Sequence, residues 1–245
     1  MKPDPYSMTP LLQAQRLLVL TGAGISAESG IPTFRGAGGL WRNHKAEDLA
    51  TPEAFSRDPE LVWEWYRWRR SICNHAEPNE AHRVIAALEG RVPGFLLATQ
   101  NVDGLHHRAG STQVIALHGN IDDARCTACA TVFDLGVDPP LMPSCPACGS
   151  QTRPHILWFG EQYWPGTLET AWSFAARADA VLVVGTSGAV GPPAQLALEA
   201  IQRGAFSIEV NPERSSLSDA VDLHIATGAV QALARIAEAF GLPTS

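Results

Sequence analysis

The sequence lacks any long apolar run. No stretch approaches the roughly 18 apolar residues of a membrane-spanning helix, and the first ten residues lack the basic and then apolar order of a secretion signal. Positive charge is also scarce, because 18 basic residues face 25 acidic ones and the net charge is -7. Nucleic-acid binding through phosphate neutralisation needs the opposite sign. We therefore expect a cytoplasmic protein that binds neither membranes nor nucleic acid directly.

Cysteine is sparse and unevenly spaced. Four of the five cysteines form two Cys-x-x-Cys pairs separated by 15 residues, namely Cys126, Cys129, Cys145 and Cys148. In a reducing compartment this spacing favours four thiolate ligands for one structural Zn²⁺ over disulfides. Four protein ligands leave no coordination position for a substrate, so the metal would hold a small module together. Two redox disulfides are the alternative, and metal analysis would distinguish them.

Short apolar runs alternate with helical patterns along most of the 245 residues, and the chain has no internal repeat or low-complexity tract. The six runs predicted as buried strands are 17–20, 95–98, 114–117, 180–184, 206–210 and 222–225. Helices are predicted over 79–90, 192–204 and 230–240, each ending near a glycine. This alternation predicts an α/β fold with a Rossmann-like, doubly wound parallel sheet.

Two segments interrupt this alternation. Residues 36–75 are mostly helical and aromatic in pattern, whereas 121–154 carry the cysteine pairs and many prolines with almost no periodicity. We expect them to form a smaller lobe, made of a helical insertion and a zinc ribbon. The Rossmann-like domain then comprises 11–35, 76–120 and 155–245.

Small and polar residues follow every predicted strand. The segments concerned are 21–26, 99–104, 118–120, 185–188, 211–212 and 227–228. Ligands of open parallel sheets bind beyond the carboxyl ends of the strands, where such residues let the backbone approach closely. The six ends therefore outline one site.

The Gly22-Ala23-Gly24 turn after the first strand is typical of a phosphate-binding loop. A dehydrogenase fingerprint would also have glycine at position 27, where this chain has Ala27. No acidic residue ends the second strand to hold a ribose. The pattern thus argues against a hydride-transferring dehydrogenase, and a turn without a ligand is the alternative for the glycines alone.

Longer motifs extend this signal. Residues 22–35 read GAGISAESGIPTFR, 99–106 read TQNVDGLH, 117–120 read LHGN, 153–161 read RPHILWFGE, 185–187 read GTS, and 211–212 read NP. In these motifs the chain resembles the sirtuin family of NAD-dependent protein lysine deacylases. The blocks occur in the family's order between residue 17 and about residue 230, so the resemblance covers nearly the whole chain.

The resemblance implies NAD as co-substrate and assigns the residues that hold it. Asn101 and Asp103 would form the nicotinamide pocket beside Ile25 and Ile31, although by themselves they could equally cap a helix. The implied NAD-binding residues are Gly22, Ala23, Gly24, Ile25, Phe34, Arg35, Trp41, Gln100, Asn101, Asp103, Gly185, Thr186, Ser187, Asn211 and Ala229. Phe34 and Arg35 belong to the loop that covers the reacting ribose, and Gly185 to Ser187, Asn211 and Ala229 line the adenosine half.

His118 lies at the end of a predicted strand and faces the expected site. A neutral imidazole there could take a proton from a ribose hydroxyl, which is general-base work suited to histidine. A lone histidine is more often a satisfied polar residue. The resemblance implies that His118 is the catalytic histidine.

Tyr66 and Arg69 are three residues apart and share a face of a predicted helix. An arginine fork beside a phenol could bind a small carboxylate, although the residues alone favour a packed aromatic stripe. The pair resembles that of a sirtuin branch, similar to the mitochondrial desuccinylase and its bacterial relatives, that reads succinyl- and malonyl-lysine. By the same resemblance, Phe159, Gly160 and Glu161 hold the substrate backbone by β-augmentation.

The resemblance implies removal of acetyl and of succinyl or malonyl groups from lysine, with nicotinamide and 2'-O-acyl-ADP-ribose as products. The partners would be acylated-lysine proteins or peptides. A plain deacetylase and a mono-ADP-ribosyltransferase are the alternatives.

A non-enzymatic zinc-ribbon module would need a basic or apolar face, yet residues 120–150 contain four aspartates and one arginine. A monomer is compatible with the sequence, which does not decide the oligomeric state.

Overall fold

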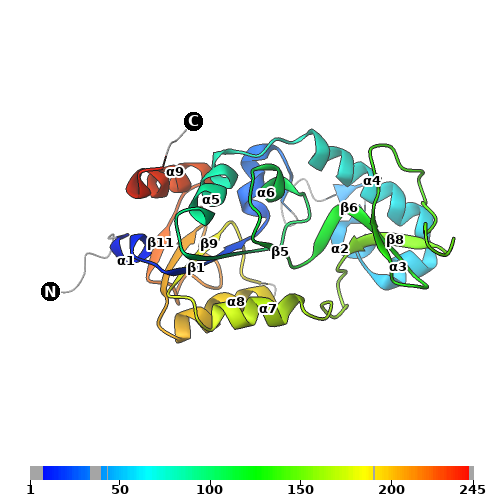
Figure 1. Cartoon of the computed structure of the whole chain (residues 1–245). Helices are drawn as coiled ribbons and strands as arrows, with labels where there is room; N and C mark the ends of the chain where they lie inside the picture. The colour runs from blue at the N-terminus through cyan, green and yellow to red at the C-terminus, as the bar shows by residue number, and fades with distance from the viewer. Residues whose placement is uncertain (1–7, 34–39, 43, 190, 243–245) are drawn as a thin grey trace.

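A six-stranded parallel sheet forms the centre of the computed structural model, which describes residues 8–33, 40–42, 44–189 and 191–242 (Figure 1). Its strands are β1 (Arg16–Thr21), β4 (Gly94–Thr99), β5 (Val114–Ala116), β9 (Ala180–Val184), β10 (Phe206–Val210) and β11 (Leu223–Ile225). Their order is β11-β10-β9-β1-β4-β5, and every pairing is parallel. All six predicted strands and the predicted doubly wound α/β fold are confirmed.

Two layers of helix cover this sheet (Figure 1). On one face α5 (Glu80–Glu89) and α9 (Ala229–Phe240) pack against the odd-numbered residues of β1, and on the other α7 (Thr167–Ala175) and α8 (Gly191–Gln202) pack against the even-numbered ones. A short helix, α1 (Thr9–Leu12), precedes β1. Because successive strand residues point to opposite faces, one apolar run builds both cores.

The predicted helices differ little from those observed. Asn79 caps α5 by accepting a hydrogen bond from the Ala81 amide at 3.0 Å, and Gly241, with φ 62°, ends α9. The helix predicted over 192–204 spans Gly191–Gln202. The sequence did not predict α7, whose buried residues Ala171 and Ala175 are small and give a weak apolar signal.

A second hydrophobic core lies beside the sheet. It unites α2 (Ala46–Leu49), α3 (Pro52–Arg57) and α4 (Pro59–His75) with a three-stranded antiparallel sheet of order β7-β6-β8. These strands are β6 (Gly119–Cys126), β7 (Val132–Asp134) and β8 (Thr152–Ile156), and a two-stranded ribbon joins β2 (Leu40–Trp41) to β3 (His44–Lys45). The predicted boundaries between the two lobes stay a prediction.

Local capping starts the helices of this second region. The Thr51 hydroxyl accepts from the Ala54 amide at 3.1 Å, and the Asp58 carboxylate accepts from the Leu61 amide at 3.0 Å. The near absence of periodicity over 121–154 concealed strands β6 to β8, because β6 is irregular where it pairs with β8. Among the described residues, no helix is long and apolar enough to cross a membrane.

Candidate active site

The carboxyl ends of β1 and β9 meet where the strand order reverses. The Gly22 amide donates to Val184 O at 3.0 Å, and the Gly24 amide donates to Gly185 O at 2.8 Å. A Cβ on Gly24 would lie 2.7 Å from the Gly185 Cα, and Gly185 itself has φ +64°. Only glycine fits this contact, which brings the predicted phosphate turn against the predicted adenosine segment. After Gly22 the chain forms a 3-10 helix, η1 (Ala23–Ser29).

Amide side chains connect these strand ends. Asn101 Nδ2 donates to Gly22 O at 3.1 Å, and Gln100 Nε2 donates to the Thr186 hydroxyl at 3.0 Å. Asn211 Nδ2 donates to Thr186 O at 2.9 Å. Five of the predicted NAD-binding residues therefore lie in one hydrogen-bonded group across the sheet edge.

A buried carboxylate lies next to this group. Asp103 accepts from the Ser26 hydroxyl at 2.7 Å and from the Leu105 amide, at the start of α6 (Leu105–Arg108), at 3.0 Å. Burial raises the pKa of Asp103 above its usual range, and these hydrogen bonds partly offset the rise. Asn101 Nδ2 also reaches the Ser26 hydroxyl at 3.2 Å. The two residues predicted for the nicotinamide pocket thus converge on Ser26.

Two buried histidines beneath η1 escaped the sequence analysis. His82 Nε2 lies 3.4 Å from the Ser26 hydroxyl, and its ring centroid lies 4.8 Å from that of His106. His106 Nε2 lies 3.0 Å from the Thr21 hydroxyl. Burial lowers the pKa of His82 to about 4 and that of His106 to about 3. The available signal was a histidine on the predicted apolar face of α5 and another inside the 99–106 motif.

His118 lies between β5 and β6. Its Nδ1 lies 3.0 Å from Gln100 O, and its Nε2 lies 3.1 Å from the Tyr163 hydroxyl. Burial lowers the pKa of His118, and the contact with Gln100 O partly offsets this. The imidazole is therefore neutral at pH 7, as a general base must be. The sequence analysis did not identify Tyr163.

Tyr66 is buried in α4, and Arg69, three residues on, is partly buried. The Tyr66 hydroxyl accepts from Trp158 Nε1 at 2.9 Å, and Arg69 lies 5.4 Å from the Trp65 ring centroid. Burial raises the pKa of Tyr66 and of Asp103, and the positive charge of Arg69 opposes both rises. Arg69 therefore lies in electrostatic range of both the phenol and the Asp103 carboxylate.

The three residues predicted to hold the substrate backbone differ in exposure and in hydrogen bonding. Phe159 is 47% exposed and Gly160 has φ +83°, whereas the Glu161 carboxylate binds Arg153 and accepts from the Trp158 amide at 2.8 Å. Burial tends to raise the pKa of Glu161, but hydrogen bonds from Arg153 and Trp158 outweigh it and lower the pKa. Glu161 thus supports the segment through its hydrogen bonds, whereas Phe159 and Gly160 are exposed.

Two more of the predicted NAD-binding residues, Ala229 and Trp41, lie in other elements. Ala229 begins α9 and is tied to η1, because the Val230 amide donates to Glu28 Oε1 at 3.0 Å. Trp41 packs in the second core, 6.3 Å from the Trp68 ring centroid. Phe34 and Arg35 lie outside the described residues.

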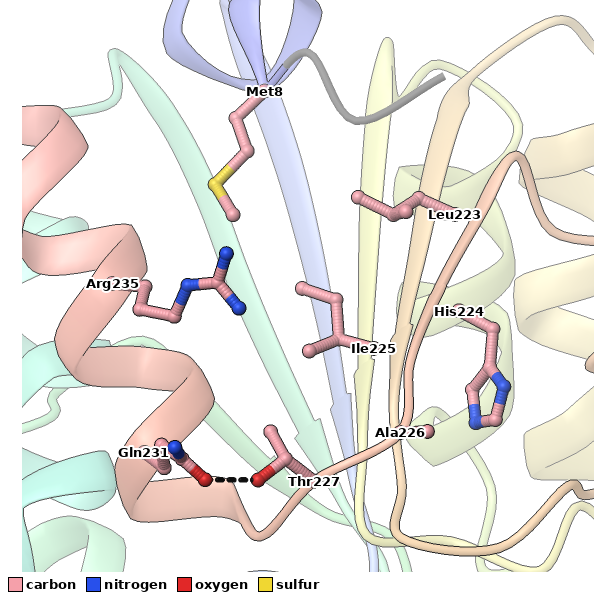
Figure 2. A pocket seen from close by; sticks show the side chains of 8 residues that line it. All are labelled: Met8, Leu223, His224, Ile225, Ala226, Thr227, Gln231 and Arg235. Atoms are coloured by element: carbon pink, nitrogen blue, oxygen red, sulfur yellow. Dashed lines mark hydrogen bonds between the residues drawn. The ribbon is translucent and has the colours of Figure 1, made fainter.

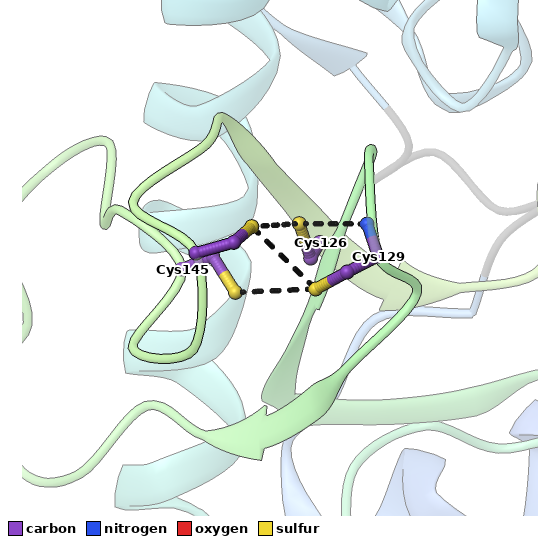
Figure 3. Close-up of side chains that lie close together, drawn as sticks. Cys126, Cys129 and Cys145 are labelled. Carbon is purple, nitrogen blue, oxygen red and sulfur yellow. Dashed lines mark hydrogen bonds between the residues drawn. The ribbon is translucent and has the colours of Figure 1, made fainter.

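The four predicted zinc ligands form one cluster (Figure 3). All four sulfur atoms lie within 4.8 Å of one another, with Cys126 Sγ 3.5 Å from Cys148 Sγ and Cys129 Sγ 3.7 Å from Cys145 Sγ. A tetrahedral Zn²⁺ with bonds of about 2.3 Å requires sulfur separations of about 3.8 Å. The Ala128 and Cys129 amides also point at Cys126 Sγ at 3.3 Å. The four thiols therefore fit one structural Zn²⁺.

A pocket of about 430 Å³ lies apart from this site, between β11 and α9 (Figure 2). Its lining residues are Met8, Leu223, His224, Ile225, Ala226, Thr227, Gln231 and Arg235. β11 is one edge strand of the sheet, whereas His118 follows the opposite edge strand, β5. None of the predicted site residues lines the pocket, so it is not the site that the strand ends form.

Comparison with known proteins agrees with the fold and the motifs. The model of the Sir2 family matches residues 22–192. An NAD-dependent protein deacylase of Aeropyrum pernix is 49% identical over 233 residues, or 95% of each chain. One of Thermus thermophilus is 51% identical over 230 residues, covering 91% of this chain and 90% of the relative.

Solved structures extend this likeness to three dimensions. A Sir2 homologue in complex with NAD is 43% identical, with a TM-score of 0.91 over 98% of this chain and 94% of that one. A Sir2 protein in complex with a p53 peptide and NAD⁺ is 31% identical, with a TM-score of 0.86 over 98% and 99%. The chain belongs to the Sir2 family.

Proposed function

We propose that this chain is an NAD-dependent protein lysine deacylase that transfers the acyl group of a modified lysine to ADP-ribose. The observation that carries the proposal is a neutral, oriented histidine, His118, at the same sheet edge as the Ser26, Asn101 and Asp103 cluster. The relatives named NAD-dependent protein deacylase support the reaction. A solved Sir2 homologue described as a complex with 2'-O-acetyl ADP ribose, 43% identical with a TM-score of 0.90, supports the product.

The chain's own residues would divide the work. The glycine contact between η1 and β9 would admit the diphosphate of NAD, and Thr186 and Asn211 would hold its adenosine half. Asn101 and Asp103 would bind the carboxamide of nicotinamide. The acyl oxygen of the modified lysine would attack the anomeric carbon of the ribose as nicotinamide leaves. His118 Nε2 would then take a proton from a ribose hydroxyl, which attacks the acyl carbon, and the free lysine amine leaves after water is added. Acylated-lysine proteins or peptides would be the partners, in the cytoplasm.

We propose further that Tyr66 and Arg69 extend the substrate range to succinyl- and malonyl-lysine. The positive charge of Arg69 opposes the raised pKa of both Tyr66 and Asp103, which supports a subsite for a carboxylate beside α4 and near the proposed nicotinamide pocket. A negatively charged acyl tail would gain charge-assisted hydrogen bonds there. A neutral acetyl group would gain none, and a variant that replaces the Arg69 guanidinium with an uncharged side chain would remove the difference between the two substrates.

The test measures nicotinamide release with NAD and one peptide in unmodified, acetyl-lysine and succinyl-lysine forms. We expect release with both acyl peptides and none without acylation, and loss of the succinyl activity alone in Arg69→Met. Arg67→Met is the matched control, because Arg67 lies exposed on the same helix and donates to Pro139 O. Activity on acetyl-lysine alone, unchanged by Arg69→Met, would leave a plain deacetylase.

His118→Ala tests the role of the base. We expect product formation to fall by about 10²- to 10⁴-fold, the usual contribution of a general base, while the circular dichroism spectrum stays that of the folded protein. Retained turnover would contradict the assignment. ADP-ribose transferred to the protein substrate, detected by mass spectrometry, would instead indicate a mono-ADP-ribosyltransferase.

A further inference from the structure

The Tyr163 hydroxyl contacts Nε2 of His118, the atom that takes the proton in the proposed reaction. Tyr163 Oη lies 3.1 Å from Nε2 of His118, while Nδ1 of the same ring lies 3.0 Å from Gln100 O. A carbonyl oxygen only accepts hydrogen bonds, so Nδ1 carries the proton of the neutral ring. Nε2 is then the acceptor, and the Tyr163 hydroxyl donates to it.

The fold holds Tyr163 in this place from two sides. Its neighbour Trp164 stacks on His155 of β8, with ring centroids 4.2 Å apart and planes at 24°. A Cβ added to Gly119, the residue after His118, would lie 3.0 Å from Trp164 and 2.0 Å from His155 O. The Tyr163 ring packs against the hydrophobic core between β1 and α7. The loop between β8 and α7 is thus fitted against the backbone beside His118.

Nε2 of a neutral imidazole has a single lone pair in the ring plane, so it accepts from one hydroxyl at a time. A ribose hydroxyl that gives its proton to Nε2 must therefore replace the phenol. We propose that Tyr163 is a positioning residue. In the NAD-free protein its hydroxyl donates the hydrogen bond to Nε2 of His118 that the ribose hydroxyl later donates, and this bond breaks before the acyl group is transferred. This inference rests on the proposed deacylase function.

The contact makes a prediction about one step only. In the proposed reaction, nicotinamide leaves before His118 takes the proton. The sugar intermediate can then either recombine with nicotinamide to give NAD again or go on to acyl transfer, which depends on His118. Tyr163→Phe keeps the ring and removes the competing hydroxyl. We expect the ratio of acyl-ADP-ribose formed to labelled nicotinamide exchanged to rise by about 2- to 10-fold, as for the loss of one competing hydrogen bond. The rate of exchange without product formation should stay within about twofold.

Two results would overturn the proposal. An unchanged ratio in Tyr163→Phe would show that the hydroxyl does not compete for Nε2, and a fall in the ratio would show that it assists proton transfer. Tyr163→Leu separates the hydroxyl from the ring. We expect it to raise the ratio as Tyr163→Phe does, with a lower melting temperature because the ring packing is also lost. A ratio that rises only in Tyr163→Leu would assign the effect to packing.

Nitrogen NMR of the histidine rings tests the contact without any turnover. In NAD-free protein above pH 7, loss of the donor in Tyr163→Phe should move the Nε2 resonance of His118 downfield, toward that of a free lone pair, and leave Nδ1 protonated. An unmoved Nε2 resonance would refute the contact. A wild-type protein that shows the contact but no nicotinamide exchange would refute the proposed function and leave the contact standing, so the two failures are distinguishable.

Discussion

At the scale of single residues, burial decides which groups carry charge. His82 and His106 are almost fully buried below η1, and burial lowers the pKa of both rings well below 6.5. His118 follows the same direction for the same main cause. Three histidines are therefore neutral at pH 7, two as structural supports for Ser26 and Thr21 and one as the proposed base.

These lowered pKa values predict how stability depends on pH. Below pH 6.5, His82 and His106 bind protons in the unfolded chain but stay neutral in the folded protein. Because the unfolded state binds more protons, the free energy of unfolding falls as the pH falls from about 6.5 toward 4. The slope per histidine is about 1.4 kcal/mol per pH unit. Urea unfolding of His82→Asn should show a shallower dependence than wild type over this range.

His75→Asn is the control for this experiment, because His75 lies at the exposed end of α4. It should leave the pH dependence of the free energy of unfolding as in wild type. An equal slope in His82→Asn and wild type would mean that His82 accepts its proton in the folded state.

At the scale of elements, helix ends connect the site to the core. Asn79 caps α5 through Oδ1, and its Nδ2 donates to Ile25 O at 2.8 Å and to the Ser29 hydroxyl at 3.0 Å. Glu28 similarly joins η1 to the first turn of α9. The proposed NAD loop is thus fixed by the N-terminal ends of the two helices that cover the same face of the sheet.

Two substitutions separate the functions of Asn79. Asn79→Ala should lower the free energy of unfolding by about 1–2 kcal/mol, since it removes the cap of α5. Asn79→Ser should recover most of this, because serine caps nearly as well. Alanine has no donor, and the single hydroxyl of serine cannot replace both donations of Asn79 Nδ2 to Ile25 O and Ser29, so both variants should raise the KM for NAD, measured by nicotinamide release. A normal KM in Asn79→Ser would show that the tie to η1 does not affect binding.

At the scale of the whole molecule, two strands connect the zinc cluster with the proposed active site. β6 runs from Gly119, next to His118, to the ligand Cys126, and β8 ends at Ile156, where Leu157 donates to His118 O at 2.9 Å. A Zn²⁺ bound by the four cysteines would therefore take no part in the proposed reaction, but it would lie at the far end of the strands that position His118.

Removal of the metal should consequently abolish activity through unfolding of the small sheet. In isolated zinc modules, metal binding supplies on the order of 10 kcal/mol of folding free energy. We expect one zinc per chain by metal analysis, and faster hydrogen exchange in β6 to β8 than in the six-stranded sheet after chelation or in Cys129→Ser.

Cys73→Ala is the matched control, because Cys73 is buried in α4 away from the cluster. It should keep one zinc per chain. Much less than one zinc in the purified wild-type protein would contradict the zinc assignment and favour disulfides.

Much of the fold could be predicted because its signals are local. Buried strands of a parallel sheet appear as short apolar runs, and Asn79 and Gly241 mark helix ends by their own chemistry. Strands β6 to β8 could not be predicted in this way, since an irregular strand and a metal cluster need no apolar alternation. The alanine-faced α7 escaped for a similar reason.

The sequence by itself determined the parallel sheet, the strand ends that outline the site and the four zinc ligands, because spacing and periodicity along the chain are sufficient for these. Three contacts were decided by tertiary structure alone. The Tyr163 hydroxyl donates to His118, His82 contacts the Ser26 hydroxyl, and Glu161 forms an ion pair with Arg153. Each of these contacts depends on the direction in which a side chain points, and the first two join segments far apart in the chain. Only the packed lobes fix that direction.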